Sequence, residues 1–421
     1  MTSNRQLGSV DRDMIMQLCA LSGISAHDAT QHWADTRYAS IVWSRLTEPG
    51  DSTAGALLAA LGPQHALALV VDGADAQTIV AHAREAGHTL DPDAVARALQ
   101  RFRPRLDARA TATDIAQAHA AGLQVITPGD DCWPAGLRDL GLHAPLLLWV
   151  RGDPQLLTHP SISVVGARAA TGYGTQVTAE IVDGLCQAGL AIVSGAAYGI
   201  DAVAHRAALA AEVPTIAVLA GGADRPYPIA HGTLLNRIAA HGVVCAEMIP
   251  GSAPTKWRFR MRNRVIAALS PATLVTEAGV HSGTLNTAGH AAELGRSLGA
   301  VPGPVTSAAS AGCHLLIREY DASLVTNARD ACELAGVNDM LALFRDVPDT
   351  GAAARMPPIH ERVLDAIPLR GSRTLGEIAR AAGLSEHDTR GALAELELLG
   401  HVVLRTRDVA AEPAWALVRA P

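Results

Sequence analysis

The stretch Ser161-Ile-Ser-Val-Val-Gly166 decides the fold of this chain, because the plan that begins there repeats along the chain. It is a short apolar run without polar alternation, which is typical of a strand that is covered on both faces of a sheet. A glycine-rich turn follows it, then a helical pattern over Thr175–Ala188, then a second apolar run over Leu190–Ser194. A strand–helix–strand unit of this kind predicts a right-handed crossover between parallel strands.

The same alternation continues to about residue 345. The further apolar runs are Thr215–Leu219, Val243–Met248, Ala272–Glu277, Ala300–Pro302 and Ser323–Thr326, and the further helical patterns include Ile200–Ala211 and Thr284–Leu298. Residues 111–345 are therefore predicted to form an α/β domain with a mostly parallel, doubly wound sheet.

The two flanking blocks differ from this centre. Residues 1–110 contain helical patterns only, and one of these begins with Asp91 as N-cap and Pro92 at the first helical position. Residues 346–358 indicate a linker. Residues 359–421 combine a helix-turn-helix pattern with two short strands, which predicts a winged helix. From residue 356 onward there are 8 Arg against 9 Asp and Glu, so we expect this domain to bind protein rather than duplex DNA.

Composition limits the functions that are open to the chain. It has 421 residues, 34 Lys and Arg against 41 Asp and Glu, and a net charge of -7. No apolar run reaches membrane-spanning length and no apolar signal core follows the N-terminus, so we expect a cytoplasmic protein without a membrane partner. The six cysteines form no C-x-x-C pair, which argues against a zinc site or a disulfide framework. Taken alone, the acidic charge argues against a nucleic-acid partner.

One segment reverses that last inference. Residues 254–264 (PTKWRFRMRNR) carry five positive charges and no acid, alternating with Trp257, Phe259 and Met261. In extended form, the charges would occupy one face and the apolar groups the other. Cations for phosphates and flat rings for bases are what single-stranded nucleic acid requires. The alternative is a solvated basic loop that its aromatic side chains anchor to the core.

Glycine-rich turns follow several of the predicted strands. They cover Gly166–Gly174, Ser194–Asp201, Ala220–Asp224 and Ser282–Thr284. Ligands bind at the carboxyl ends of strands in such sheets, and free helix N–H groups there accept phosphate. The first turn is not G-x-G-x-x-G, so a plain NAD site is not expected, and we predict no cofactor. Asp201 and His205 could form a catalytic pair, although a helix-capping Asp and a packed His are the favoured interpretation.

These motifs together resemble the DNA-processing protein A family (DprA/Smf). The matching stretches, which span about residues 123–330, are Thr127–Asp130, Ser163–Arg168, Ser194–Asp201 with His205, Gly221-Gly222 with Asp224, Tyr227-Pro228, Arg262–Ile266, Ser282–Thr284, Val301–Gly303 and Gly312 with Leu316-Ile317. The resemblance implies an extended Rossmann-like sheet domain that also forms a homodimer, with an N-terminal helical (SAM-like) domain and the C-terminal winged helix. It implies a non-enzymatic, cytosolic bacterial protein that binds single-stranded DNA, protects incoming DNA and helps load the RecA recombinase during natural transformation.

The resemblance also assigns the groove. No catalytic and no metal-binding residues are expected. The residues expected to contact or shape bound DNA are Gly166, Arg168, Ser194, Gly195, Tyr198, Gly221, Gly222, Lys256, Arg258, Arg260, Arg262, Asn263, Arg264, Ser282, Gly283 and Thr284. Tyr198 stands where many members carry a basic residue, so stacking would replace a phosphate contact there.

An enzymatic alternative is a nucleotide-binding phosphoribohydrolase of the lysine-decarboxylase-like type. Its Gly-Gly-x-Gly-Thr-x-x-Glu motif is matched only in part by Gly283-Thr284, and Thr287 stands where the glutamate should be.

Overall fold

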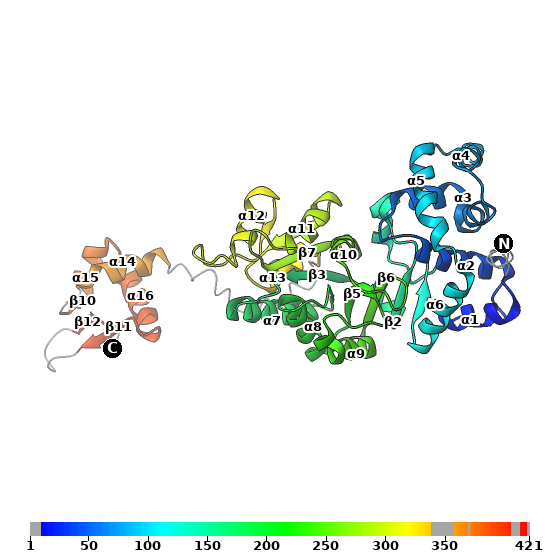
Figure 1. The fold of residues 1–421 in the computed structure, drawn as a ribbon. Helices are drawn as coiled ribbons and strands as arrows, with labels where there is room; N and C mark the ends of the chain where they lie inside the picture. The colour runs from blue at the N-terminus through cyan, green and yellow to red at the C-terminus, as the bar shows by residue number, and fades with distance from the viewer. Residues whose placement is uncertain (1–9, 338–356, 369–370, 406–412, 419–421) are drawn as a thin grey trace. The chain divides into compact units, whose positions relative to one another are not determined.

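The computed structural model describes residues 10–337, 357–368, 371–405 and 413–418. The chain divides into two compact units, residues 1–344 and 345–421 (Figure 1). Residues 346–356 of the predicted linker lie outside the described residues.

The larger unit contains a nine-stranded sheet. Its strands are β1 (Gln124–Ile126), β2 (Leu148–Gly152), β3 (Ser161–Gly166), β4 (Ala191–Ser194), β5 (Thr215–Gly222), β6 (Val243–Met248), β7 (Ala272–Glu277), β8 (Ser297–Ala300) and β9 (Ser323–Leu324). Their order across the sheet is β1-β2-β6-β5-β4-β3-β7-β8-β9. The seven strands from β3 to β9 pair in parallel, while β1 and β2 join antiparallel at one end. The predicted α/β fold with a mostly parallel sheet is confirmed.

The order of the strands reverses direction at β3. From β3 the chain adds β4, β5 and β6 on one side, then crosses to the other side of β3 and adds β7, β8 and β9. The carboxyl ends of β3 and β7 therefore flank the point where successive connections turn in opposite directions. Such a switch point leaves a crevice in which ligands bind.

Helices cover both faces of the sheet (Figure 1). One layer contains α7 (Gly172–Gln187), α8 (Ile200–Ala210), α9 (Gly232–His241) and α13 (Ala328–Leu334), and the other contains α10 (Lys256–Leu269), α11 (Thr284–Glu293) and α12 (Ala311–Glu319). Side chains alternate between the two layers along each strand. Val164 joins the core beneath α7, whereas its neighbour Val165 packs with Val265 of α10. Burial on both faces explains why the sequence shows apolar runs rather than alternation.

One predicted boundary is wrong. The helical pattern was expected to continue to Leu298, but α11 ends at Glu293 and Ser297 begins β8. Gly295, just after the helix, adopts the left-handed conformation with φ 64°, which ends the helical path. The predicted run over Ala300–Pro302 accordingly overlaps β8 only at Ala300, the last residue of a strand that begins three residues earlier.

The N-terminal block is helical, as expected, and extends further than expected. Its helices are α1 (Arg12–Ser22), α2 (Gln31–Leu46), α3 (Ser52–Val71), α4 (Ala76–Glu85), α5 (Pro92–Phe102) and α6 (Ala108–Ala120), with a 3₁₀ turn, η2 (Arg103–Arg105), after α5. The α5 helix begins as predicted, with Asp91 as N-cap. Helix α6 crosses the proposed boundary at residue 110 and packs against α1 and α2.

Helix α3 is long and apolar enough, by length and composition, to be a candidate membrane span. Gly62 interrupts it with φ 71° and ψ 161°, just before Pro63. The two halves direct Leu57 and Leu67 into the helical core. Part of the apolar composition of α3 is thus used in packing between helices.

The smaller unit contains α14 (Pro358–Ala366), β10 (Arg373–Thr374), α15 (Leu375–Ala382), α16 (Glu386–Leu398), β11 (Val402–Arg405) and β12 (Ala414–Leu417). Its three strands pair in the order β10-β12-β11. Ser385 caps α16, as predicted, and Gly383 ends α15 in the left-handed conformation. The turn between β11 and β12 falls partly on residues 406–412, outside the described residues, and the winged-helix assignment stays a prediction.

Candidate nucleic-acid interface

A cavity of about 1100 Å³ opens at the switch point of the sheet. Its walls come from the turn after β3, the first turns of α10, and the loop between β7 and α11. These segments are far apart in the sequence and meet only because β3 and β7 are neighbours. Of the residues predicted for the groove, the cavity brings together Gly166, Arg168, Lys256, Arg260, Arg262, Asn263, Ser282, Gly283 and Thr284.

The basic segment is helical, so its predicted extended form is wrong. Thr255 caps α10 by accepting a hydrogen bond from the Arg258 backbone N–H at 3.2 Å. In a helix, successive side chains turn by about 100°, so alternating residues spread around the axis instead of forming two faces. The five cations therefore divide into groups with different surroundings.

Three cationic side chains at the cavity form no ion pair with a residue that the structure describes. Arg168, Lys256 and Arg260 are exposed and line the cavity. Among the residues that the structure describes, none of the three forms an ion pair, although 14 such pairs were found within 4.0 Å elsewhere. Uncompensated cations at a concave surface attract an anionic ligand.

Phe259 lines the cavity and contacts two arginines and a tyrosine. The guanidinium of Arg168 is 5.1 Å from the centre of its ring, and that of Arg262 is 5.8 Å away. The ring of Tyr227 is 5.3 Å from it at a tilt of 57°. These contacts orient Arg168, and they place an aromatic surface beside a free cation, which is the pairing that base stacking and phosphate binding require.

Arg262 is buried and holds the cavity wall by hydrogen bonds to two backbone carbonyl groups. Its Nη1 donates to the carbonyl oxygens of Gly195, at 2.7 Å, and Val218, at 2.5 Å. The Gly195 N–H in turn donates to Asp201. Burial, reinforced by the nearby charge of Arg168, lowers the pKa of Arg262 to about 10 although Asp201 opposes that shift. Arg262 thus ties α10 to the ends of β4 and β5, while its edge still lines the cavity.

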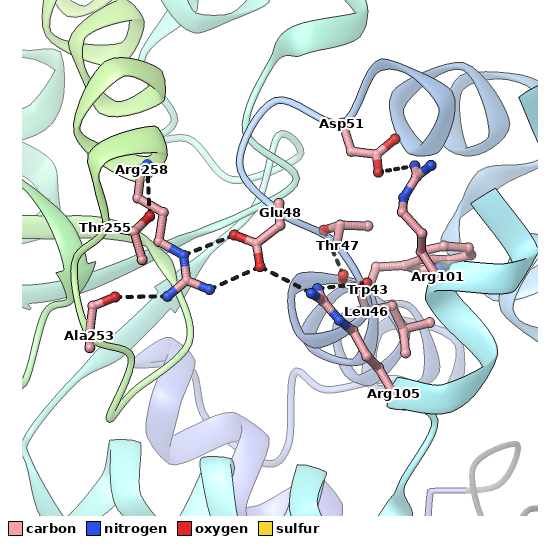
Figure 2. Close-up of polar contacts among 10 residues, drawn as sticks. All are labelled: Trp43, Leu46, Thr47, Glu48, Asp51, Arg101, Arg105, Ala253, Thr255 and Arg258. Atoms are coloured by element: carbon pink, nitrogen blue, oxygen red, sulfur yellow. Dashed lines mark hydrogen bonds and ion pairs between the residues drawn. The ribbon is translucent and has the colours of Figure 1, made fainter. Parts of the chain in front are cut away.

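Two arginines predicted to contact DNA, Arg258 and Arg264, form ion pairs with glutamates outside the cavity. Buried Arg264 pairs with both carboxylate oxygens of Glu247, at 2.8 and 2.9 Å. Arg258 pairs with both oxygens of Glu48, at 2.9 Å each (Figure 2). Neither arginine lines the cavity. We therefore no longer expect Arg264 to contact phosphate.

The predicted glycines and hydroxyls shape the walls. The Thr284 hydroxyl donates to the Gly166 carbonyl at 2.8 Å and so joins the start of α11 to the end of β3. A Cβ on Gly166 would come within 2.7 Å of Ile200. Asn263 reaches the Gly283 carbonyl at 3.4 Å.

Other predicted residues lie beside the cavity. Ser194, Gly195, Gly221 and Gly222 are buried at the ends of β4 and β5 and outside the cavity lining. Tyr198 is exposed, and its ring lies edge-on to His231 with centres 4.8 Å apart. His205 is fully buried and bonded to the Thr215 hydroxyl at 2.7 Å, as the packed interpretation predicted.

Sequence reasoning missed the acidic partners of α10. Glu48 lies in the loop between α2 and α3, and Glu247 lies in β6, so no local pattern connects either one to residues 254–264. Burial opposes ionisation of Glu48, but hydrogen bonds and charge from Arg258 and Arg105 outweigh it and lower the pKa of its carboxyl group.

Within the part of the chain that the structure describes, no group of three His, Cys, Asp or Glu side chains could hold a metal ion. The carboxylate that lines the cavity is Asp201, which accepts backbone N–H groups from Gly195 and Ala197.

The comparisons with known proteins agree with this geometry. The model of a family described as DNA recombination-mediator protein A matches residues 124–336, which include the whole nine-stranded sheet and all the residues that line the cavity. The chain belongs to the DNA recombination-mediator protein A family. Membership assigns it to DNA processing and recombination.

Relatives extend the match beyond the sheet. A Mycobacterium tuberculosis protein that carries the DNA processing protein DprA name is 42% identical over 391 residues, which is 90% of this chain and 93% of the relative. DNA processing protein DprA of Streptococcus pneumoniae is 42% identical over 201 residues, 48% of this chain and 70% of the relative. The X-ray structure of DprA from Streptococcus pneumoniae superposes with a TM-score of 0.57 and 31% identity, covering 71% of this chain and 97% of that one.

Proposed function

We propose that the cavity at the switch point binds the backbone and bases of single-stranded DNA without strong sequence preference. The observation that carries the proposal is that Arg168, Lys256 and Arg260, which form no ion pair among the described residues, line one cavity together with Phe259, whose ring contacts Arg168. Cations bind phosphates of any sequence, and every base has a flat face that can stack.

Exposed aromatic side chains support single strands over duplex. Trp257, which is 54% exposed, precedes Phe259 by two residues, and the ring of Tyr227, which is 45% exposed, is 5.3 Å from that of Phe259. Neither residue is part of the cavity lining. Stacking requires bases that are not already paired, so a site of this kind favours unpaired strands. Proteins that read duplex DNA usually insert a projecting helix into the major groove. This site is instead a concave cavity, which suits a flexible single strand.

The resemblance to the DprA/Smf proteins extends the proposal to the biological role. We propose that the chain protects incoming single strands and helps load the RecA recombinase, acting as a cytoplasmic homodimer through its Rossmann-like domain. Family membership supports this role, and the coating of strands by a sequence-tolerant site is compatible with both steps.

The phosphoribohydrolase alternative has weaker support. A hydrolase needs a carboxylate that can reach the substrate, whereas Asp201 is held by two backbone N–H groups. Thr287, at the position of the expected glutamate, is buried in the cavity wall.

The proposal is tested by salt-titrated binding to single-stranded and duplex DNA. The double variant Arg168→Ala/Arg260→Ala should lose affinity for single strands by about tenfold or more, and its salt slope should fall by about 1.4, or about 0.7 per phosphate contact. The matched control is Arg206→Ala/Arg237→Ala, which removes two exposed arginines from α8 and α9 in the opposite helix layer. Unchanged affinity and slope in the first variant would exclude the cavity as the DNA site.

A further inference from the structure

A second basic segment lies in the N-terminal helices. Residues 97–109 carry five arginines and one acid, Asp107. Three of these arginines, Arg101, Arg103 and Arg105, come from the last turn of α5 and from η2. Nothing in the function proposed for the cavity uses them.

The two basic segments meet at one carboxylate. Glu48 accepts hydrogen bonds from Arg258 of α10, at 2.9 Å, and from Arg105 of η2, at 3.2 Å (Figure 2). A single negative charge thus lies between two positive charges whose parent segments are about 150 residues apart in the sequence. One positive charge of this trio is not compensated.

Arg101 and Arg105 are held by contacts within the N-terminal helices and are still partly exposed. Arg101 pairs with Asp51 at 2.6 Å, and its guanidinium is 5.6 Å from the centre of the Phe102 ring (Figure 2 shows the pair). Arg105 also donates to the Leu46 carbonyl at 3.2 Å. The side chains of Arg101 and Arg105 are nonetheless 52% and 42% exposed.

Charge counting favours an anionic occupant. Arg101, Arg103, Arg105 and Arg258 form what we call the arginine ridge. Against these four charges stand the carboxylates of Glu48, Asp51 and Asp75, the last of which lies close enough to Arg103 to interact with its charge, so the ridge has a net charge of +1.

Guanidinium groups bind the oxygens of phosphodiesters as well as those of carboxylates. The more exposed Arg101 and Arg105 are the ones that can add such a contact, because Arg258 is 17% exposed and donates to both Glu48 and the Ala253 carbonyl.

Arg258 connects the ridge to the cavity. It lies on the same turn of α10 as Lys256 and Phe259, both of which line the cavity. A polyanion that leaves the cavity past Lys256 would therefore pass Arg258, which Glu48 holds, and reach the more exposed Arg105.

We infer that the arginine ridge is a second binding surface that extends the path of single-stranded DNA from the cavity onto the N-terminal helices. This inference rests on the proposed function, because the ridge continues the same backbone path. Its ligand is the phosphodiester backbone, which the ridge contacts without reading bases.

Strand length separates the ridge from the cavity. The test measures salt-titrated binding of oligothymidylates from about 6 to about 24 nucleotides to the full chain and to Arg101→Gln/Arg103→Gln. A short strand fills only the cavity, so its affinity should not change. A long strand should bind about tenfold more weakly to the variant, with a salt slope lower by about 1.4 for two lost contacts. The control is Arg206→Gln/Arg237→Gln, which should bind strands of both lengths as the unaltered chain does.

A second variant acts in the opposite direction. Glu48→Gln removes the shared negative charge, so it should bind long strands more tightly and with a steeper salt slope. If Glu48 served only to hold α10 in place, the same change would weaken binding of short and long strands alike. Thermal unfolding of each variant identifies any that fail to fold.

The outcomes separate the two claims. If Arg101→Gln/Arg103→Gln lost the same affinity for short and long strands, or lost none for long strands, the arginine ridge would not be a second binding surface. The proposal for the cavity would stand. An equal loss for duplex of the same length would also overturn the proposal for the ridge, since the ridge would then be a general polyanion surface. If the unaltered chain bound no strand of any length, the proposed function would fail and the ridge with it.

Discussion

At the scale of single residues, the site depends on which cations are left free. The sequence predicted a dense positive segment, and its composition alone could reveal that much. It could not show that Arg262 donates to Gly195 and Val218, or that Arg264 pairs with Glu247, because those partners come from other strands. Fewer positive charges of residues 254–264 are therefore available to a ligand than the five that the sequence contains.

Arg264 provides a test of this division. Arg264→Met leaves the Glu247 carboxylate, which is 15% exposed, without its ionic partner. We expect the free energy of unfolding to fall by about 2 kcal/mol, measured by denaturant titration, because a partly buried charge loses its compensation. In folded Arg264→Met, the salt slope of single-strand binding should not change.

The comparison variant is Arg168→Ala, which removes an exposed cation. Its stability should stay within about 0.5 kcal/mol of the unaltered chain while its salt slope falls by about 0.7. A slope reduced to the same extent in Arg264→Met would show that Arg264 contacts phosphate after all.

At the scale of elements, α10 shows where sequence patterns mislead. Alternation of basic and apolar residues over 256–262 is typical of a strand, and it predicted an extended segment. The structure forms a helix because Thr255 caps it and because Val265, Ile266 and Leu269, further along, pack as one helical face against the sheet. The seven-residue window was too short to include that apolar face.

The turn before α8 gives a test at this scale. Gly199 has φ 74° and ψ -129°, a conformation that suits glycine alone, and a Cβ there would overlap the Ala167 carbonyl at the end of β3. Gly199→Ala should therefore lower the free energy of unfolding by about 3 kcal/mol, measured by denaturant titration.

Gly189 is the matched control. It also has a positive φ, 77°, but no atom lies within 4 Å of a Cβ placed on it. Gly189→Ala should cost only about 1 kcal/mol. Equal losses in the two variants would mean that the contact between the Gly199 turn and the β3 turn does not hold the cavity wall.

At the scale of the whole molecule, much of the architecture was predictable and the site was only partly so. Buried parallel strands leave apolar runs, so the sheet could be inferred from Ser161–Gly166 and the runs that follow it. The order of strands depends on which edges pair in three dimensions, and no local signal places β7 beside β3. The switch point, and hence the cavity, emerges only when the strands assemble.

The central claim is that single-stranded DNA lies in the cavity between the ends of β3 and β7. Photocross-linking of an oligothymidylate to the full chain, followed by mass mapping of the labelled peptides, tests it most directly, because aromatic rings that stack on bases are the ones that cross-link. We predict label within residues 254–264 and at Tyr227. Label confined to residues 357–418, or to α12 and α13, would contradict the account.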